Sequence, residues 1–170
     1  WLWLEAQAFA GKTALSSWWV GYRANADSTR GVAVVACFLR RTTREDTAVH
    51  VLQTWGRQLA ALAGQSGRGG DLTADADGVV RVQELIQAAA AQCQRLLLVA
   101  DGLDEYAPNQ LPIEDWLPRI DTLPGNAALL VTSREGARHG IPDTHPLHQH
   151  RHTLEPSPVA EQIRLKAEAE

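Results

Sequence analysis

Apolar runs of strand length alternate with helical segments along most of this sequence, and no other feature restricts the possible folds as much. Residues 32–39, 96–100 and 127–131 are almost continuously apolar, as expected for strands covered on both faces of a sheet. The segments between them repeat apolar residues three and four positions apart, which is the spacing of one helix face. Strands that alternate with helices favour a parallel sheet with helices packed on its faces. We therefore predict an α/β fold.

The same patterns place the individual elements. We predict strands over residues 1–4, 32–39, 96–100 and 127–131, and helices over residues 13–22, 79–94 and 113–123. A further helix begins at a cap on Asp46 or Thr47 and carries Val49, Leu52, Trp55, Leu59 and Leu62 at helical spacing. Residues 64–78 are rich in Gly, Ser and Asp and are predicted to form a flexible loop.

Composition and charge restrict the class of protein. A chain of 170 residues with 45% hydrophobic and 21% charged residues is typical of one globular domain. Its net charge of −4, without a run of Lys or Arg, favours small-molecule or protein partners over direct nucleic-acid binding. No apolar run approaches the roughly 18 residues that span a bilayer, and the two distant cysteines fit a reducing compartment. We predict a cytoplasmic domain without a membrane partner.

The ends of the sequence suggest a larger parent protein. The chain contains no Met and opens directly on an apolar stretch, residues 1–4. Its last residues, 161–170, still have a helical pattern where the sequence stops. We therefore expect residues 1–170 to be one nucleotide-binding-type domain cut from a longer chain, with residues 157–170 beginning a following helical region.

Gly11, Lys12 and Thr13 stand between the first predicted strand and the first predicted helix. At a helix N-terminus, free backbone N–H groups and the positive end of the helix dipole favour an anion. In that position Lys12 reaches the β- and γ-phosphates of a nucleotide, and the Thr13 hydroxyl binds Mg²⁺. The three residues alone are a short motif that also occurs by chance, but their placement predicts a phosphate site.

Asp101 directly follows the apolar run at residues 96–100, so the sequence places a carboxylate at the C-terminal end of a buried strand. Ligands bind at that end of open α/β sheets, and carboxylate oxygens suit the hydrated shell of Mg²⁺. Asp104 and Glu105 follow after a short turn. Either could orient or deprotonate an attacking water, and we favour Glu105.

Arg134 ends the next apolar strand, directly after Thr132 and Ser133. A guanidinium or hydroxyl at this point can contact the γ-phosphate or the attacking water. The alternative is a surface arginine that follows an edge strand. We count Arg134 with Lys12, Asp104 and Glu105 as the candidate catalytic residues.

Together these motifs resemble the nucleotide-binding core of the STAND class of P-loop ATPases, and most closely a bacterial NACHT domain of the actinobacterial type. The resemblance is carried by residues 10–15, 101–105 and 131–134. Gly102, Asp104 and Glu105 match the small and acidic residues that follow the magnesium aspartate of the family. The resemblance covers nearly the whole chain. It implies a three-layer P-loop NTPase core with a mainly parallel five-stranded sheet, closed by residues 154–158 as the last strand and a helix entry.

The resemblance also implies a function. It implies that the domain binds ATP or ADP with Mg²⁺, the metal being held at Thr13 and Asp101, and hydrolyses ATP slowly as a regulatory switch. The parent would be a multidomain signalling or antiphage-defence protein. Its other domains and a nucleotide-dependent homo-oligomer are the expected partners. The residues expected to hold the nucleotide are Ala8, Phe9, Ala10, Gly11, Lys12, Thr13 and Ala14.

The loop departs from the family where glycine is usual, because Ala6 and Phe9 occupy those places. Alanine in a left-handed conformation costs on the order of 1 kcal/mol, so we expect a loop that is strained, reshaped or partly disabled. One to two kcal/mol is about tenfold in affinity, and we therefore expect nucleotide binding to survive better than turnover.

Two other functions are considered. The first is a non-catalytic interaction scaffold that binds nucleotide without hydrolysing it, or binds none. Ala6 and Phe9 support it, and the retained carboxylates and Arg134 count against it. The second is a small phosphotransferase, which needs a substrate pocket and an arginine-rich lid that the sequence does not clearly provide.

Histidines gather near the end of the chain, where five of the six fall between His139 and His152. His148, His150 and His152 alternate, so a strand would place them on one face. A zinc site is one interpretation. Because no Cys or carboxylate accompanies them at a typical spacing, we favour an exposed strand or loop, or one histidine beside the nucleotide.

Two further groups of residues are given structural roles. Trp18, Trp19, Trp55 and Trp116 occupy helical positions, and we expect them to pack in the core rather than to stack on a base. The basic cluster at residues 40–44 follows the second strand. We expect a solvated loop there, with a phosphate clamp or a subunit contact as the alternatives.

Overall fold

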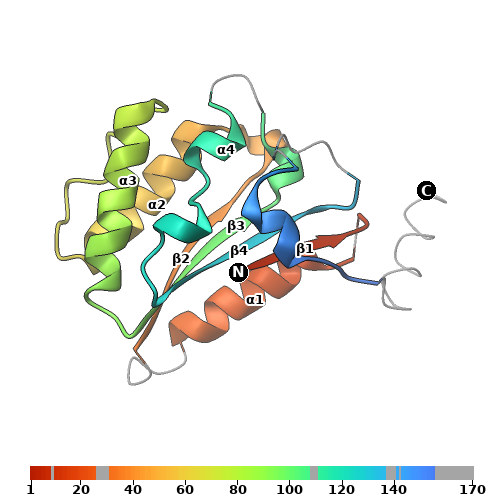
Figure 1. The fold of residues 1–170 in the computed structure, drawn as a ribbon, viewed down its shortest axis with the longest axis horizontal. Coiled ribbons are helices and arrows are strands. Elements are labelled where there is room, and N and C mark those ends of the chain that lie inside the picture. The colour runs from red at the N-terminus through yellow and green to blue at the C-terminus, as the bar shows by residue number, and fades with distance from the viewer. Residues whose placement is uncertain (9, 26–30, 108–110, 137–140, 142, 156–170) are drawn as a thin grey trace.

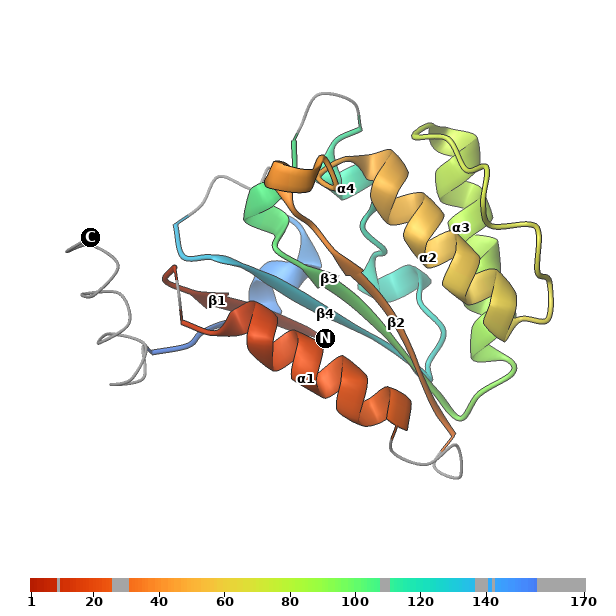
Figure 2. The same cartoon turned by 180° about the vertical axis from the view of Figure 1, so that it is seen from behind.

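Figures 1 and 2 show a computed structural model of the chain, which describes residues 1–8, 10–25, 31–107, 111–136, 141 and 143–155. One five-stranded sheet forms its centre, and every pair of neighbouring strands is parallel. Helices cover both faces of the sheet, which gives three layers. The predicted α/β fold with a five-stranded, three-layer, P-loop-like core is confirmed, and the sheet is entirely rather than mainly parallel.

The strands are β1 (Leu2–Ala6), β2 (Val32–Phe38), β3 (Arg95–Asp101), β4 (Ala127–Arg134) and β5 (Arg151–Thr153). Their order across the sheet is β2-β3-β4-β1-β5. The fourth strand in sequence therefore lies between the first and the third. Because all strands are parallel, the carboxyl ends of β1, β3 and β4 meet at one edge of the sheet.

The helices are α1 (Lys12–Asn25), α2 (Ala48–Leu62), α3 (Ala76–Ala90) and the short α4 (Ile113–Trp116). α1 covers one face of the sheet, and α2 and α3 cover the other (Figures 1 and 2). Thr47 caps α2, since its side-chain oxygen accepts a hydrogen bond from the His50 N–H. Of the two predicted caps, Thr47 is thus the one used. The backbone carbonyl of Asp46 instead accepts a hydrogen bond from the Ala107 N–H.

Alternation along the strands divides the apolar side chains between the two faces. In β3, Leu96 and Leu98 belong to the large cluster under α2 and α3, whereas Leu97 and Val99 belong to the smaller cluster that includes Trp19 of α1. Side chains two residues apart share a face. Asp101 therefore points to the α1 side, where the first turn of that helix begins.

The helix predicted over residues 113–123 is wrong in its length. α4 ends at Trp116, and a separate 3₁₀ turn follows at Ile120–Thr122. Leu117 is extended, with φ −71° and ψ 121°. The reason is Pro118, because the ring of a proline drives the preceding residue out of the helical region.

One of the four tryptophans predicted to lie in the core does not. Trp18 is 62% exposed and stacks on Tyr22, whereas Trp55 and Trp116 are 0% and 2% exposed. Trp19 packs against the smaller cluster. Within the described part of the chain α1 is the helix that covers this face, so only one side of α1 meets the sheet and the side that carries Trp18 remains in solvent.

Among the described residues, β5 is the last strand and ends at Thr153, so Leu154 and Glu155 do not form the closing strand that was predicted within residues 154–158. His148 and His150 belong to a 3₁₀ turn over Pro146–His150, whereas His152 lies in β5, so the three histidines do not share one strand face. Pro146 at the start of the turn accounts for this, since its fixed φ suits a helical first residue. Residues 156–158, the helical region predicted from 157 and His139 lie outside the described residues.

Metal-ligand clusters and membrane-spanning helices are absent from the described residues. In this part of the chain no three His, Cys, Asp or Glu side chains gather as a metal site would require. Nor does any described helix combine the length and apolarity that a bilayer crossing needs.

Residues 63–75 connect α2 to α3, and α3 begins at Ala76 with Asp75 as its cap. The last three residues of the predicted loop are therefore helical. The middle of the connection packs on α2, where a Cβ added to Gly69 would lie 2.1 Å from the carbonyl oxygen of Gly56. A Cβ added to Gly56 would in turn clash with the side chain of Leu72, which is 8% exposed. The absence of side chains at Gly56 and Gly69 lets the two backbones approach.

Gly69→Ala is expected to lower the free energy of unfolding by about 1–3 kcal/mol, since the new methyl group has to push the loop off α2. Urea denaturation measures this. Gly70→Ala is the matched control, because nothing lies within 4 Å of a Cβ at that neighbouring position, and it should change stability by less than about 0.5 kcal/mol. Equal effects of the two substitutions would contradict the close contact.

Candidate functional site

A cleft of about 500 Å³ opens at the carboxyl edge of the sheet. This volume is typical of small-molecule sites. The cleft is bounded by the loop before α1, the ends of β3 and β4, and the turn after β2. Its lining residues are Ala8, Ala10, Gly11, Lys12, Thr13, Ala14, Leu39, Arg40, Thr42, Asp101, Gly102, Asp104, Glu105, Thr132 and Arg134.

The loop between β1 and α1 turns on Gly11, whose φ of +88° is a left-handed conformation. Ala6 is the last residue of β1 and is fully buried, and among the described residues the only non-glycine with a positive φ is Arg44. The strain predicted at Ala6 is therefore wrong, because a strand residue needs no left-handed backbone. Phe9 lies outside the described residues.

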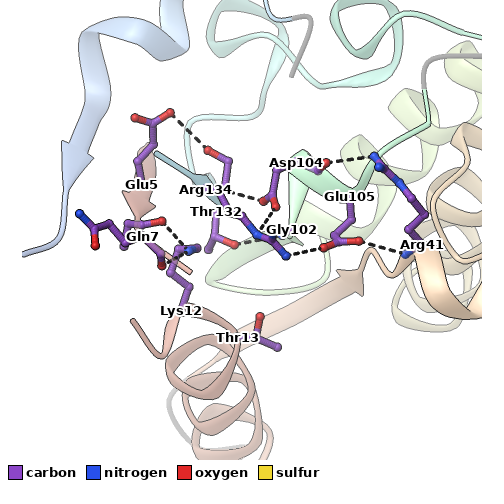
Figure 3. Close-up of polar contacts among 12 residues, drawn as sticks. Glu5, Gln7, Lys12, Thr13, Arg41, Gly102, Asp104, Glu105, Thr132 and Arg134 are labelled. Atoms are coloured by element: carbon purple, nitrogen blue, oxygen red, sulfur yellow. Dashed lines mark hydrogen bonds and ion pairs between the residues drawn. The ribbon is translucent and has the colours of Figure 1, made fainter. Parts of the chain in front are cut away.

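Lys12 is the first residue of α1 and lies over the loop. Its Nζ donates to the carbonyl of Ala6 at 2.7 Å and to that of Gln7 at 3.1 Å (Figure 3). Burial lowers the pKa of its ammonium group from the ordinary value of 10.5, and Arg134 acts in the same direction, while Asp104, Asp101 and Glu5 oppose the shift. The first turn of α1 contains no acidic residue. An anion at this helix end would meet a cation and unpaired N–H groups.

Asp101 ends β3 with its side chain toward the first turn of α1. The Thr13 hydroxyl donates to its Oδ2 at 2.7 Å, and the Thr132 hydroxyl donates to its Oδ1 at 2.8 Å. Asp101 is 2% exposed. The pair Thr13 and Asp101 presents only oxygen atoms at the cleft, which is the donor set that Mg²⁺ prefers, and a site with so few protein ligands leaves room for waters and phosphate oxygens. The residues present thus fit a magnesium ion.

Gly102 turns the chain sharply after Asp101, with a φ of +85°. A Cβ at this position would lie 3.1 Å from the carbonyl oxygen of Leu39. The short 3₁₀ turn Leu103–Glu105 follows. The turn brings Asp104 and Glu105 back to the cleft, beside the end of β4.

Arg134 binds both of these carboxylates. Its Nε lies 3.0 Å from Asp104 Oδ2, its Nη2 lies 3.0 Å from Glu105 Oε1, and its backbone N–H donates to Asp104 Oδ1 at 2.8 Å (Figure 3). The Arg134 side chain is 55% exposed, whereas that of Asp104 is 9% exposed. The arrangement brings the predicted catalytic residues together, with the guanidinium occupied by carboxylates.

The turn after β2 completes the site, although a solvated loop was the favoured prediction there and a phosphate clamp only an alternative. Arg41 donates from its backbone N–H to Glu105 Oε2 at 3.4 Å and from its guanidinium to the Asp104 carbonyl at 3.3 Å. Arg40 and Thr42 line the cleft. The predicted solvated loop at residues 40–44 is exposed, yet it also borders the site. The basic cluster directly after a strand was the sequence feature from which this position at the site could have been predicted.

A second polar group missed by sequence reasoning lies on the opposite face of the sheet. Glu5 is fully buried in β1, where Arg151 of β5 donates to its Oε2 at 2.6 Å and the Ser133 hydroxyl lies 3.4 Å from its Oε1. The indole N–H of Trp3 donates to Ser133 at 2.9 Å. A buried carboxylate needs such partners. This group ties β1 to its two neighbours just below the loop.

Residues 1–134 match the family described as nephrocystin 3, N-terminal. The chain belongs to this family. The match runs from β1 to the last residue of β4, so every protein group of the cleft named above lies within the nephrocystin 3 N-terminal region. This family is different from the NACHT family that the motifs resemble. No curated protein matches the chain.

Gly102→Ala is expected to lower the free energy of unfolding by about 1–3 kcal/mol, because alanine is strained at a φ of +85°. The midpoint of urea denaturation measures the change. Gly125→Ala serves as the control, since no atom lies within 4 Å of a Cβ there, and it should shift stability by less than about 0.5 kcal/mol. A stable Gly102→Ala protein would mean that the turn before Asp104 and Glu105 has another available conformation.

Proposed function

We propose that this chain binds ATP, or ADP, with Mg²⁺ in the cleft and acts as a slowly hydrolysing regulatory switch. The observation that carries the proposal is the convergence of three strand ends on one position. Lys12 and Thr13 come from the start of α1 after β1, Asp101 and Glu105 from the end of β3 and the turn that follows it, and Arg134 from the end of β4. A cation, a metal-binding pair and a carboxylate within one cleft suit a polyphosphate ligand.

Phosphate binding is assigned to the start of α1. The ammonium group of Lys12 now donates to two loop carbonyls, and a phosphate would take over those hydrogen bonds as charge-assisted ones. Gly11 leaves the backbone free to approach the anion, since no atom lies within 4 Å of where its Cβ would be. Ala8, Ala10 and Ala14 line the cleft around it with small side chains.

Metal binding is assigned to Thr13 and Asp101, whose oxygens lie 2.7 Å apart. When bound there, Mg²⁺ would neutralise charge on the phosphates. The protein's own contribution is to hold one hydroxyl and one carboxylate at the same corner of the cleft.

Hydrolysis is assigned to the carboxylates after β3. Glu105, or Asp104 in its place, would accept a proton from water at its carboxylate oxygen. In the present arrangement both are paired with Arg134. A γ-phosphate would compete with these carboxylates for the guanidinium, and its arrival would release a carboxylate toward water. That exchange gives ATP and ADP different contacts, which a nucleotide switch requires.

The wider setting of this proposal follows the NACHT resemblance of the motifs. Membership of the nephrocystin 3 N-terminal family does not itself assign a nucleotide. We propose a cytoplasmic signalling or defence protein in which further domains, and contacts within a homo-oligomer, respond to the nucleotide in this domain, without direct contact to nucleic acid. The competing proposal is a scaffold without turnover, which the complete pairing of Asp104 and Glu105 with Arg134 favours.

Isothermal titration of ATP and ADP, each with Mg²⁺, tests the binding site in the wild type and in Lys12→Ala. Charge-assisted hydrogen bonds contribute about 1.5–3 kcal/mol, so the variant should bind roughly 10- to 100-fold more weakly. Arg81→Ala is the control, because it removes a partly exposed cation that pairs with Glu84 on α3, outside the cleft. Unchanged affinity in Lys12→Ala would refute the proposed phosphate site.

Phosphate release separates the switch from the scaffold. Glu105→Gln is expected to lower the rate of release by about 10²–10⁴-fold while ATP affinity changes little, since removal of a general base has that effect. Asp104→Asn is measured beside it to decide which carboxylate serves. If the wild type binds ATP tightly but releases no phosphate above the background of Lys12→Ala, the scaffold is the correct assignment.

A further inference from the structure

Thr132 has a place in the cleft that the proposed function does not use. It lies in β4, is 1% exposed, and donates from its hydroxyl to Asp101 Oδ1 at 2.8 Å. The same hydroxyl oxygen accepts the backbone N–H of Gly102 at 3.0 Å. Figure 3 shows Thr132 next to Gly102.

Strand alternation explains why this threonine and not its neighbour reaches Asp101. β3 and β4 are paired in parallel with Ala100 opposite Val131, so Asp101 and Thr132 come one residue later on adjacent strands. Both follow residues that belong to the α2 and α3 side of the sheet, and both therefore point to the α1 side. Ser133 points the other way, where it contacts Trp3 and Glu5.

The hydrogen bonds around Thr132 define the direction of its proton. A threonine hydroxyl has one proton and two lone pairs. Because the Gly102 N–H can only donate, it uses a lone pair, and the proton is directed to Asp101 Oδ1. The other carboxylate oxygen, Oδ2, is the one that contacts Thr13 at 2.7 Å. Thr132 and Thr13 thus hold the carboxylate from opposite sides.

We propose that Thr132 is a positioning residue for the metal site, which keeps Asp101 in the one orientation that presents Oδ2 beside the Thr13 hydroxyl. This inference rests on the proposed binding of Mg²⁺ with nucleotide. Mg²⁺ requires a nearly ideal octahedral arrangement of oxygens, so it tolerates a rotated carboxylate poorly. Partners that orient a metal ligand typically change metal affinity by 10- to 100-fold.

The experiment measures the Mg²⁺ concentration that gives half-maximal ATP binding, at one subsaturating ATP concentration, with this chain. Thr132→Val removes the hydroxyl and keeps the branched shape that suits a strand. In this variant the Gly102 N–H still has a hydrogen-bond acceptor, because it also donates to the backbone carbonyl of Thr132, at 3.2 Å in the wild type. We expect the half-maximal Mg²⁺ concentration to rise about tenfold or more. Nucleotide binding in EDTA should be unchanged.

Three comparisons separate positioning from a general loss of structure. Thr132→Ser keeps a hydroxyl, so its half-maximal Mg²⁺ concentration should stay within about twofold of the wild-type value. That change is well below the 10- to 100-fold effect typical of a lost orienting partner. Ser133→Ala removes a buried hydroxyl from the same strand on the other face and should leave the Mg²⁺ dependence unchanged. In an Asp101→Asn background, Thr132→Val should raise the half-maximal Mg²⁺ concentration by less than about a further twofold, since the effects of two residues that act through one contact are not additive.

The possible outcomes either support or overturn the proposed role of Thr132. A folded Thr132→Val protein with the Mg²⁺ dependence of the wild type overturns it, as does an equal shift in Ser133→Ala or an undiminished shift in the Asp101→Asn background. If Thr132→Val does not fold, Thr132→Ala takes its place with the same expectation. If the wild type binds no ATP at any Mg²⁺ concentration, the proposed function fails and this inference fails with it. If ATP binding is lost in Lys12→Ala but its Mg²⁺ dependence is unchanged in the Thr132 variants, only the inference about Thr132 is refuted and the proposed function stands.

Discussion

The position of β4 between β1 and β3 is the constraint on which the rest of this structure depends. Parallel pairing aligns the carboxyl ends of the three strands, and strands of such a sheet lie only about 5 Å apart. Lys12 after β1, Asp101 at the end of β3 and Arg134 at the end of β4 are consequently held within one cleft, although they are far apart in sequence. Without β4 in that position, Arg134 could not lie beside Asp104 and Glu105.

Charge is balanced separately on the two faces of the sheet. On the cleft side, Arg134 neutralises two carboxylates while remaining 55% exposed, and exposure keeps such pairs weak and exchangeable. On the other side, Arg151, whose side chain is 41% exposed, binds Glu5, whose side chain is fully buried. Removing a partner from a fully buried carboxylate is costly. The first arrangement suits groups that change partners when a ligand binds, and the second suits a permanent tie between β1 and β5.

How far the sequence predicted the structure depended on the kind of signal. Continuous apolar runs identified β2, β3 and β4, because a strand buried on both faces leaves little ambiguity. The helix predicted to Leu123 failed at Pro118, whose effect on Leu117 is local and was overlooked. Trp18 was assigned to the core because helical spacing identifies an apolar face but does not reveal whether anything covers it. Ala6 was expected to be strained because the motif was aligned by position, whereas in the structure Ala6 ends a strand.

By itself the sequence determined the α/β class, the order of the elements, and the loop and strand ends on which the candidate residues stand, since periodicity and strand-end chemistry are local properties. Only the tertiary structure decided which side chains share a partner. The pairing of Arg134 with Asp104 and Glu105, of Thr132 with Asp101, and of Arg151 with Glu5 all join different elements. Such pairs depend on strand order and on the face to which each side chain points at the sheet edge, and both emerge only when the strands are assembled.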